Sequence, residues 1–172
     1  MHRIRAYHMD IKPENILLDN ENPEAPEGRL RIALCDFGYS SIEDHNLKAR
    51  GTARYLPVDF FANDPVFGSQ LTEEQLAKAD VWGVGFVIYL ILNNGHLPSL
   101  LPRDAKDKPR FIAEMRHLYH NPPVEGSAFR KPAENADPLL KLVWSMLAFD
   151  YKERPRMQDA WDFYQDYCMP QH

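Results

Sequence analysis

Four polar side chains, three of them within six residues, are of types that could act together on one substrate. The stretch YHMDIKPENILL (residues 7–18) contains Asp10, Lys12 and Asn15, and the stretch CDFG adds Asp36. The oxygens of Asn15 and Asp36 suit a hard divalent ion such as Mg²⁺, which keeps some water and takes further ligands from phosphate. Lys12 is a point charge suited to a transferring phosphoryl group. Asp10 can orient a hydroxyl group and accept its proton, so the set favours phosphoryl transfer.

Two short aliphatic segments are predicted to position these side chains. Residues 15–18 (NILL) and 29–35 (RLRIALC) partly alternate, which indicates two antiparallel strands. The stretch between them, DNENPEAPEG, is acidic, rich in proline and ends in glycine, which is typical of a solvated surface loop. Because a hairpin brings its two ends together, we expect the four polar side chains to face one another.

The remainder of the chain is predicted to be one long loop followed by helices. Residues 36–64 keep no period, and loops of this length inside a domain are usually functional or disordered. A helix over about 77–92 is apolar almost all round, so we expect it at the centre of the domain. Thr72 and Gln75 form a possible capping box, which we assign to a separate short turn or to this helix. Three further helices are expected over 109–121, from Asp137 onward, and over 156–168.

Composition restricts the class of protein. The chain has 172 residues, which suits one ordinary domain, and its net charge of −5 argues against a nucleic-acid or anionic-membrane partner. Two cysteines are too few for a disulfide framework, and no apolar stretch of a secretory signal follows the first basic residues. The longest apolar run, residues 81–92, is too short to span a bilayer. We therefore expect a cytoplasmic or nuclear protein.

The polar stretches resemble the motifs of a known family. Residues 7–15 resemble the catalytic loop of eukaryotic protein kinases, H-R-D-L-K-P-E-N, and CDFG resembles the D-F-G metal motif of that family. The resemblance implies that Asp10 is the catalytic base, that Lys12 contacts the transferred phosphate, and that Asn15 and Asp36 hold Mg²⁺. It also implies ATP as the cofactor and a protein hydroxyl as the acceptor. The Lys-Pro-Glu spelling resembles the serine/threonine branch.

Three later stretches extend the resemblance in order along the chain. GTARYLPVDF (residues 51–60) is similar to the substrate-docking end of the activation segment. ADVWGVG resembles the central helix whose aspartate, here Asp80, braces the catalytic loop. ERP resembles the site of a late arginine, here Arg154, which pairs with the acid that ends the activation segment, here Asp59.

The resemblance also implies supporting roles for further residues. His8 would lie in the core under Phe37, and Cys35 would line the floor of the ATP pocket. Thr52 would hydrogen-bond near the catalytic aspartate and lysine. Glu14 would help to select basic residues near the acceptor hydroxyl, and Tyr55 belongs to the activation segment as a candidate phosphorylation site.

Two departures from the family pattern have physical consequences. Met9 stands where the family has arginine, so a phosphorylated activation segment would lose its bidentate partner, and we expect activity not to be switched in that way. Asp59 stands where the family has glutamate, and it keeps the charge on a side chain one methylene shorter.

We therefore expect a mainly α fold, namely a kinase-like large carboxy-terminal lobe with a small β-hairpin and without the small lobe, because the chain has no G-x-G-x-x-G. Residues 1–172 would form a partial kinase domain: catalytic loop 7–18, metal motif and activation segment 36–59, helical subdomain 71–168.

Two functions remain open. The first is a serine/threonine kinase whose truncated lobe is very weak or inactive alone, with a small lobe supplied by another segment. The second is a non-catalytic kinase-like module, a pseudokinase or decoy, that binds a protein partner. In either case we expect Phe37, His8 and their apolar neighbours to form an exposed patch.

Overall fold

The computed structural model describes residues 5–19, 31–42, 47–62, 66, 68–124 and 126–167. Residues 20–28 of the predicted acidic loop, residues 29–30 of the second predicted strand and the last residue of the predicted final helix lie outside this part of the chain, whereas Asp19 belongs to a strand.

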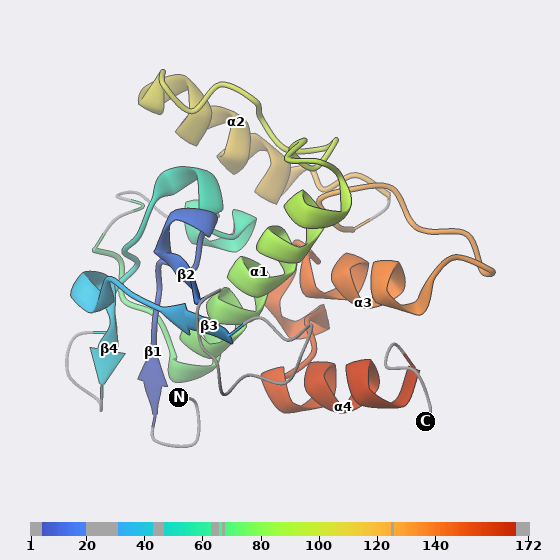
Figure 1. Cartoon of the computed structure of the whole chain (residues 1–172). Coiled ribbons are helices and arrows are strands. Elements are labelled where there is room, and N and C mark those ends of the chain that lie inside the picture. Colours follow the sequence, from blue (N-terminus) through green and yellow to red (C-terminus); the bar gives the residue numbers. More distant parts are fainter. Residues whose placement is uncertain are drawn as a thin grey trace.

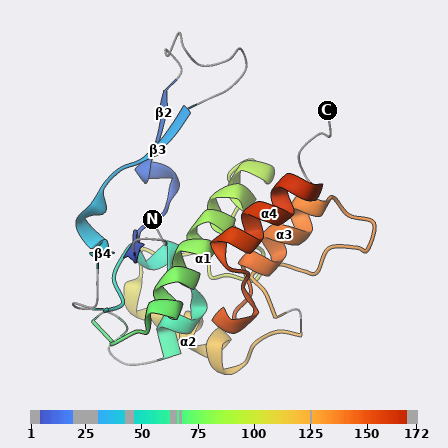
Figure 2. The ribbon, with the colours of Figure 1, turned by 90° about the horizontal axis from the view of Figure 1, so that it is seen from below.

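Helices dominate the described residues. They comprise α1 (Glu73–Leu92), α2 (Lys108–His120), α3 (Pro138–Met146) and α4 (Met157–Tyr167). Figure 1 shows α1 at the centre, with the strands on one side and α3 and α4 on the other. In the view from below, α3 and α4 run alongside α1, and the strands β2 (Ile16–Asp19) and β3 (Arg31–Leu34) project on the other side of α1 (Figure 2). The observed architecture is the mainly helical one that we predicted.

Helix α1 is central because it is apolar on nearly every side. Trp82 and Phe86 are at most 1% exposed. Its first turn is closed by a full capping box, in which the Thr72 hydroxyl accepts from the main-chain N–H of Gln75 and the Gln75 side chain accepts from the main-chain N–H of Thr72. The capping box therefore belongs to the central helix, which begins four residues earlier than the predicted start at 77. The helix is long and apolar enough to cross a membrane, yet 61% of its most apolar 18-residue stretch is buried inside the fold, as expected of a core helix.

The short strands form two antiparallel pairs. Strand β2 (Ile16–Asp19) pairs with β3 (Arg31–Leu34), an antiparallel pair as the sequence predicted, and Ile16 lies opposite Leu34. Strand β1 (Ala6–Tyr7) pairs with β4 (Ser41–Ile42). This second pair lies partly in the segment predicted as one continuous loop, so that prediction was wrong there. Two-residue strands are too short to show an alternating pattern.

The carboxy-terminal helices pack on the side of α1 away from the strands. Val81 of α1 forms a buried cluster with Leu142 and Met146 of α3 and Ala160 of α4. Gly85 permits this approach, because a Cβ there would lie 2.7 Å from the Cβ of Met146. The three- and four-residue spacing of the apolar residues in 156–168 predicts a buried face that includes Trp161, but this side chain is 51% exposed. It stacks on Tyr164 with ring centroids 5.8 Å apart.

Candidate active site

The catalytic loop is fastened to helix α1 by one buried carboxylate. Asp80 is 3% exposed, and its Oδ2 and Oδ1 accept hydrogen bonds from the main-chain N–H groups of His8 and Met9, each at 2.9 Å. One turn further along α1, a Cβ at Gly83 would lie 2.8 Å from the Cβ of Ile11. The small residue therefore lets the loop lie directly on the helix.

Met9 shows how the loop accommodates its unusual residue. Its φ is +67°, a left-handed conformation that costs an L-residue roughly 1–2 kcal/mol. The side chain is 5% exposed and belongs to the main apolar core. An uncharged thioether is suited to this position, because a cation buried without a partner would be costly.

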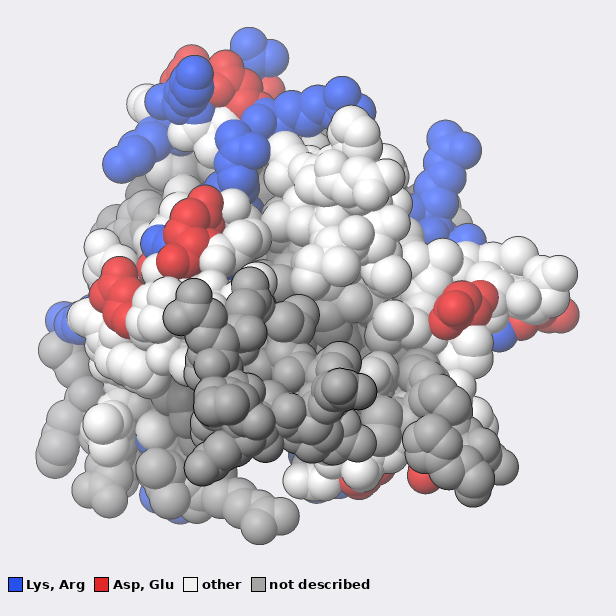
Figure 3. All heavy atoms as spheres, in the orientation of Figure 1, with Lys and Arg blue, Asp and Glu red and all other residues white. Residues whose placement is uncertain are grey.

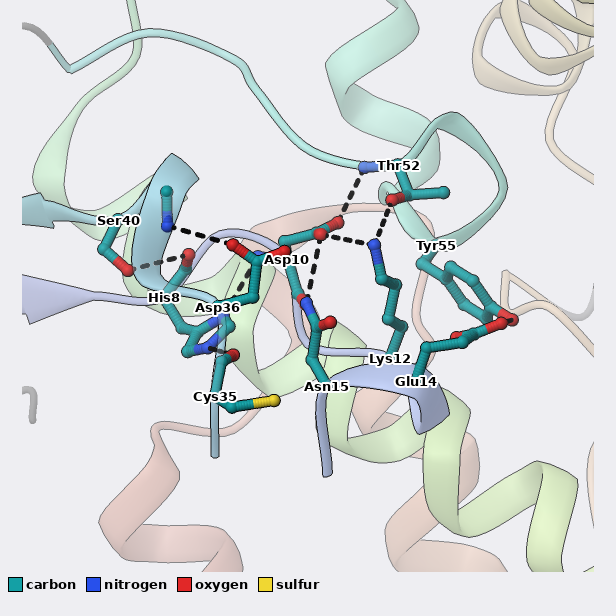
Figure 4. A network of polar contacts seen from close by, with 11 residues as sticks. His8, Asp10, Lys12, Glu14, Asn15, Cys35, Asp36, Ser40, Thr52 and Tyr55 are labelled. Carbon is teal, nitrogen blue, oxygen red and sulfur yellow. Dashed lines mark hydrogen bonds and ion pairs between the residues drawn. The ribbon is translucent and has the colours of Figure 1, made fainter. Parts of the chain in front are cut away.

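Asp10 is the centre of the polar network in Figure 4. The residue is 2% exposed. Its Oδ2 accepts from Lys12 Nζ at 2.6 Å and from Asn15 Nδ2 at 3.1 Å, and its Oδ1 accepts from the main-chain N–H of Thr52 at 2.8 Å. Asn15 Nδ2 also donates to the Asp10 carbonyl at 2.8 Å. These contacts fix the position of the carboxylate.

The same contacts keep Asp10 ionised. Burial alone raises the pKa of this carboxyl, but hydrogen bonds from Lys12 and Thr52 outweigh burial and hold the pKa below its ordinary value of 3.8. At neutral pH the group is therefore a carboxylate that can accept a proton.

Residues 51–55 come to the catalytic loop through Thr52. Its Oγ1 accepts from Lys12 Nζ at 2.8 Å, so the ammonium joins Asp10 and Thr52. The preceding Gly51 has φ +119°, and a Cβ there would lie 2.5 Å from the carbonyl oxygen of Met9. Only glycine allows this close approach. Gly51 was missed as a site residue, although its place directly before Thr52 in GTARYLPVDF was a signal.

Asn15 and Asp36 meet at the base of the β2–β3 hairpin. The main-chain N–H of Cys35 donates to the carbonyl of Asn15 at 2.9 Å, which brings Asp36 beside the network (Figure 4). Asp36 has φ +59°, and its Oδ1 accepts from the N–H of Gly38 at 3.3 Å.

These two side chains fit a cation with few protein ligands. Because Asn15 turns its Nδ2 towards Asp10, its Oδ1 is the atom left to act as a ligand. Asp36 adds carboxylate oxygens at the exposed side. The described residues contain no cluster of three His, Cys, Asp or Glu side chains that could enclose a metal ion. Two oxygen ligands match Mg²⁺, which completes its shell with water and phosphate.

His8 supports the hairpin from below. It is fully buried, and its ring lies 4.9 Å from that of Phe37. Its Nδ1 accepts from the N–H of Asp10 at 3.4 Å, so Nε2 carries the hydrogen and donates to the Cys35 carbonyl at 3.0 Å. Phe37 is 53% exposed, so the predicted exposed patch includes Phe37 but not His8. Cys35 contributes its main chain to these contacts, and its thiol is free.

The remaining predicted residues lie around this centre. Tyr55 donates from its hydroxyl to Glu14 Oε1 at 3.4 Å on the exposed side. Burial and the Glu14 carboxylate raise the pKa of Tyr55. Farther away, Asp59 and Arg154 form a buried ion pair. Their exposed fractions are 8% and 1%.

Comparisons with known proteins agree with this geometry. A family model described as Protein kinase domain matches residues 1–163. Similar curated proteins include the calcium and calcium/calmodulin-dependent serine/threonine-protein kinase DMI-3 of Medicago truncatula, 24% identical over 165 residues. Calcium-dependent protein kinase 4 of Plasmodium falciparum (isolate 3D7) is 28% identical over 163 residues. The matches cover 94% and 93% of this chain, which spans only 28% and 26% of those relatives.

Solved structures show the same fold. The Cydia pomonella granulovirus kinase PK-1 has a TM-score of 0.61 at 24% identity, and the match covers 92% of this chain and 49% of that one. A crystal structure of the Rad53 kinase domain and SCD2 in complex with AMPPNP has a TM-score of 0.59 at 17% identity, over 94% and 51% of the two chains. The predicted kinase-like, mainly helical fold is confirmed.

Proposed function

The chain belongs to the protein kinase family, and we propose that it carries the phosphoryl-transfer half-site of a serine/threonine kinase. The observation that carries the proposal is the Asp10 network: a buried, ionised carboxylate with an ammonium 2.6 Å away, both tied to Thr52. A single aspartate without these contacts would give little support to a catalytic role, because surface aspartates are common.

Asp10 and Lys12 divide the chemistry between them. An acceptor hydroxyl within hydrogen-bond reach of Asp10 would be oriented by the carboxylate and would give it a proton as the hydroxyl oxygen bonds to the γ-phosphorus of ATP, while the bond from that phosphorus to ADP breaks and ADP leaves. The Lys12 ammonium stabilises the charge on the transferred group. The Thr52 hydroxyl accepts from Lys12 and its main-chain N–H donates to Asp10, so residues 51–55 are fastened to the loop that carries both side chains.

ATP and Mg²⁺ complete the proposal. Asn15 and Asp36 are the residues that would hold Mg²⁺, which would neutralise phosphate charge when bound. Cys35 would line the floor beneath the nucleotide. A similar solved structure, that of the Rad53 kinase domain, is in complex with AMPPNP, which supports a nucleotide at this fold. The isolated 172-residue chain is expected to be a very weak kinase without further contacts to ATP, which a small lobe would supply.

The test is phosphoamino-acid analysis of acceptor proteins incubated with labelled ATP, Mg²⁺ and the natural protein that contains this chain. Label on serine or threonine that falls to background in Lys12→Met supports the proposal. Arg156→Met is the matched control, since its only ion-pair partner in the described part of the chain is Asp159, on the exposed surface. Label on tyrosine alone, or label unchanged in Lys12→Met, would refute it.

A second candidate, the non-catalytic protein-binding module, rests on a different observation. Six large apolar side chains on or beside β2, β3 and β4 are between 45% and 69% exposed: Leu17, Leu18, Ile32, Phe37, Tyr39 and Ile42. Such a surface is typical of an interface with a small lobe or another protein. If this candidate is right, Ile32→Glu abolishes partner capture while Lys12→Met leaves it unchanged.

The distribution of charged side chains supports a protein as the partner. On the face in Figure 3, lysine and arginine gather over α2 but are interspersed with aspartate and glutamate. With a net charge of −5, this pattern favours protein partners over nucleic acid or anionic membrane. We propose a cytoplasmic or nuclear location, which the cysteine usage favours, since two cysteines are too few for a disulfide framework.

A further inference from the structure

Arg54 lies close to the place where an acceptor hydroxyl would meet Asp10. It belongs to the 3₁₀ turn Ala53–Tyr55, and the residue before this turn, Thr52, donates its main-chain N–H to the Asp10 carboxylate at 2.8 Å. Because a 3₁₀ turn rises about 2.0 Å per residue, the backbone of Arg54 lies about 4 Å along the turn from that of Thr52. The guanidinium is therefore attached to the wall of the proposed acceptor site.

The guanidinium of Arg54 is held in place but has no carboxylate partner. Its Nη2 donates to the main-chain carbonyl of Arg103 at 3.2 Å, which fixes the half-buried side chain against the loop between α1 and α2. The carbonyl is neutral, and no carboxylate in the described part of the chain forms an ion pair with Arg54. The contact uses one N–H of a planar fork that carries several. The remaining donors and the positive charge are available to a ligand.

The loop beside this guanidinium adds positive charge. Residues 103–110 contain four cations and two carboxylates. Both carboxylates already accept hydrogen bonds from main-chain N–H groups of the loop, Asp104 at 3.0 Å and Asp107 at 3.2 Å. Of the cations, Arg110 pairs with Glu114, whereas the other three have no ion-pair partner among the described residues. In a chain with a net charge of −5, this surface is a local exception that attracts anionic groups.

The next residue along the turn gives the acceptor site an opposite side. Side chains that follow one another in a 3₁₀ turn leave the backbone about 120° apart, so Arg54 and Tyr55 extend in different directions. The Tyr55 hydroxyl donates to Glu14 Oε1 at 3.4 Å, and Figure 4 shows the two side chains together on one side of the network. The site therefore has a carboxylate on the Tyr55 side and a guanidinium on the other.

We propose that Arg54 is a specificity-determining residue that binds the carboxylate of an acidic side chain near the acceptor hydroxyl of the substrate protein, an inference that rests on the proposed phosphoryl-transfer function. A guanidinium matches a carboxylate in a planar, bidentate arrangement, which an ammonium cannot do. Since an extended chain advances about 3.3 Å per residue, the carboxylate belongs within about three positions of the acceptor. The substrate class is proteins whose acceptor hydroxyl lies in an acidic segment.

The first experiment measures peptide binding without ATP, so that it does not depend on phosphoryl transfer. Alanine heptapeptides with a central serine carry one aspartate at each other position in turn, and matched peptides carry asparagine there. Peptide-observed NMR with the natural protein gives each Kd. We expect values of about millimolar and, at one or two adjacent positions, at least about threefold tighter binding of the aspartate peptide.

Salt dependence provides the control for charge. The preference for aspartate should disappear as the ionic strength rises from about 0.01 M to about 1 M, because exposed charges are then screened. Equal affinity of the aspartate and asparagine peptides at every position, or a preference that high salt leaves unchanged, would overturn the proposal.

Variants assign the preference to Arg54. Arg54→Gln should bring the ratio of the two Kd values to about one, and Arg54→Glu should favour a lysine peptide over the aspartate peptide at the same position. Arg156→Gln, at an exposed arginine that pairs with Asp159, is the matched control and should keep the ratio of the wild type. Each ratio compares two peptides on the same protein, so a change in overall affinity does not affect it. An unchanged ratio in Arg54→Gln, or no reversal in Arg54→Glu, would refute the assignment.

Steady-state kinetics separate this inference from the proposed function. With labelled ATP and Mg²⁺, the natural protein should show the same preference in kcat/KM, and through KM more than kcat, because Arg54 binds the acceptor and not the reacting atoms. Phosphorylation of the serine without a preference for aspartate peptides would overturn the inference and leave the proposed function standing. A binding preference without any phosphorylation would refute the proposed function and keep the carboxylate site.

Discussion

Replacing Asp80 with alanine removes the acceptor that fastens the catalytic loop to α1. The carboxylate accepts two hydrogen bonds, each of 2.9 Å, from the N–H groups of His8 and Met9. All three residues are at most 5% exposed, so water cannot replace the lost acceptor. At about 1–3 kcal/mol for each buried donor left unpaired, Asp80→Ala should lower the free energy of unfolding by about 2–6 kcal/mol. That is a large share of the roughly 5–15 kcal/mol typical of a domain.

The assay is urea unfolding followed by tryptophan fluorescence, because Trp82 lies within the core and reports on its unfolding. Asp80→Asn keeps one acceptor oxygen and should lose about half as much. The matched control is Asp166→Ala, an exposed aspartate on α4, which should leave the urea midpoint unchanged. If Asp80→Ala unfolds at the same urea concentration as this control, the carboxylate does not hold the loop.

Three further predictions concern the surroundings of the site. Gly51→Ala forces a Cβ to within 2.5 Å of a main-chain oxygen at positive φ, so thermal unfolding should show a loss of about 2–5 kcal/mol; an unchanged midpoint would contradict the close approach. Arg154→Leu leaves the buried carboxylate of Asp59 without its partner and should lower the free energy of unfolding by about 3–5 kcal/mol. The double variant with Asp59→Leu should regain part of this loss, and equal losses in the single and double variants would show that the pair is not coupled. Because the folded pKa of Asp10 is lowered, its ionised form stabilises the fold above pH 3.8, and this contribution disappears as pH falls through the folded pKa. The difference in stability between wild type and Asp10→Asn should therefore shrink below pH 3.8, and a constant difference from pH 7 to 3 would contradict this.

The helices were predictable where their ends carry strong local signals. Asp107 and Asp137 cap α2 and α3, and a proline occupies the first turn of each. The predicted start of α1 was four residues too late, because the residues of a capping box are the same whether they precede a single turn or a long helix. Trp161 was misplaced because α4 has one buried face, and the tryptophan lies just beyond its edge next to the buried Ala160.

The site was predictable as a set of residue types but not as a geometry. The order of the motifs indicated that Asp10, Lys12 and Thr52 would meet, and the structure brings them together. No periodic pattern could show that Gly51 must lie against a main-chain oxygen, or that the Oδ2 of Asp59 would be buried without a hydrogen-bond partner among the described residues. Both features depend on contacts between segments far apart in the sequence.

We propose above that the Asp10 carboxylate is the base of a phosphoryl transfer. The most direct measurement is the steady-state rate of γ-phosphoryl transfer from ATP to a serine-containing acceptor by the natural protein, compared with Asp10→Asn and the surface control Asp159→Asn. We predict a fall of about 10²–10⁴-fold in kcat for Asp10→Asn with little change in KM for ATP, and no change for the control. Equal rates for wild type and Asp10→Asn would show that the Asp10 carboxylate is not the base.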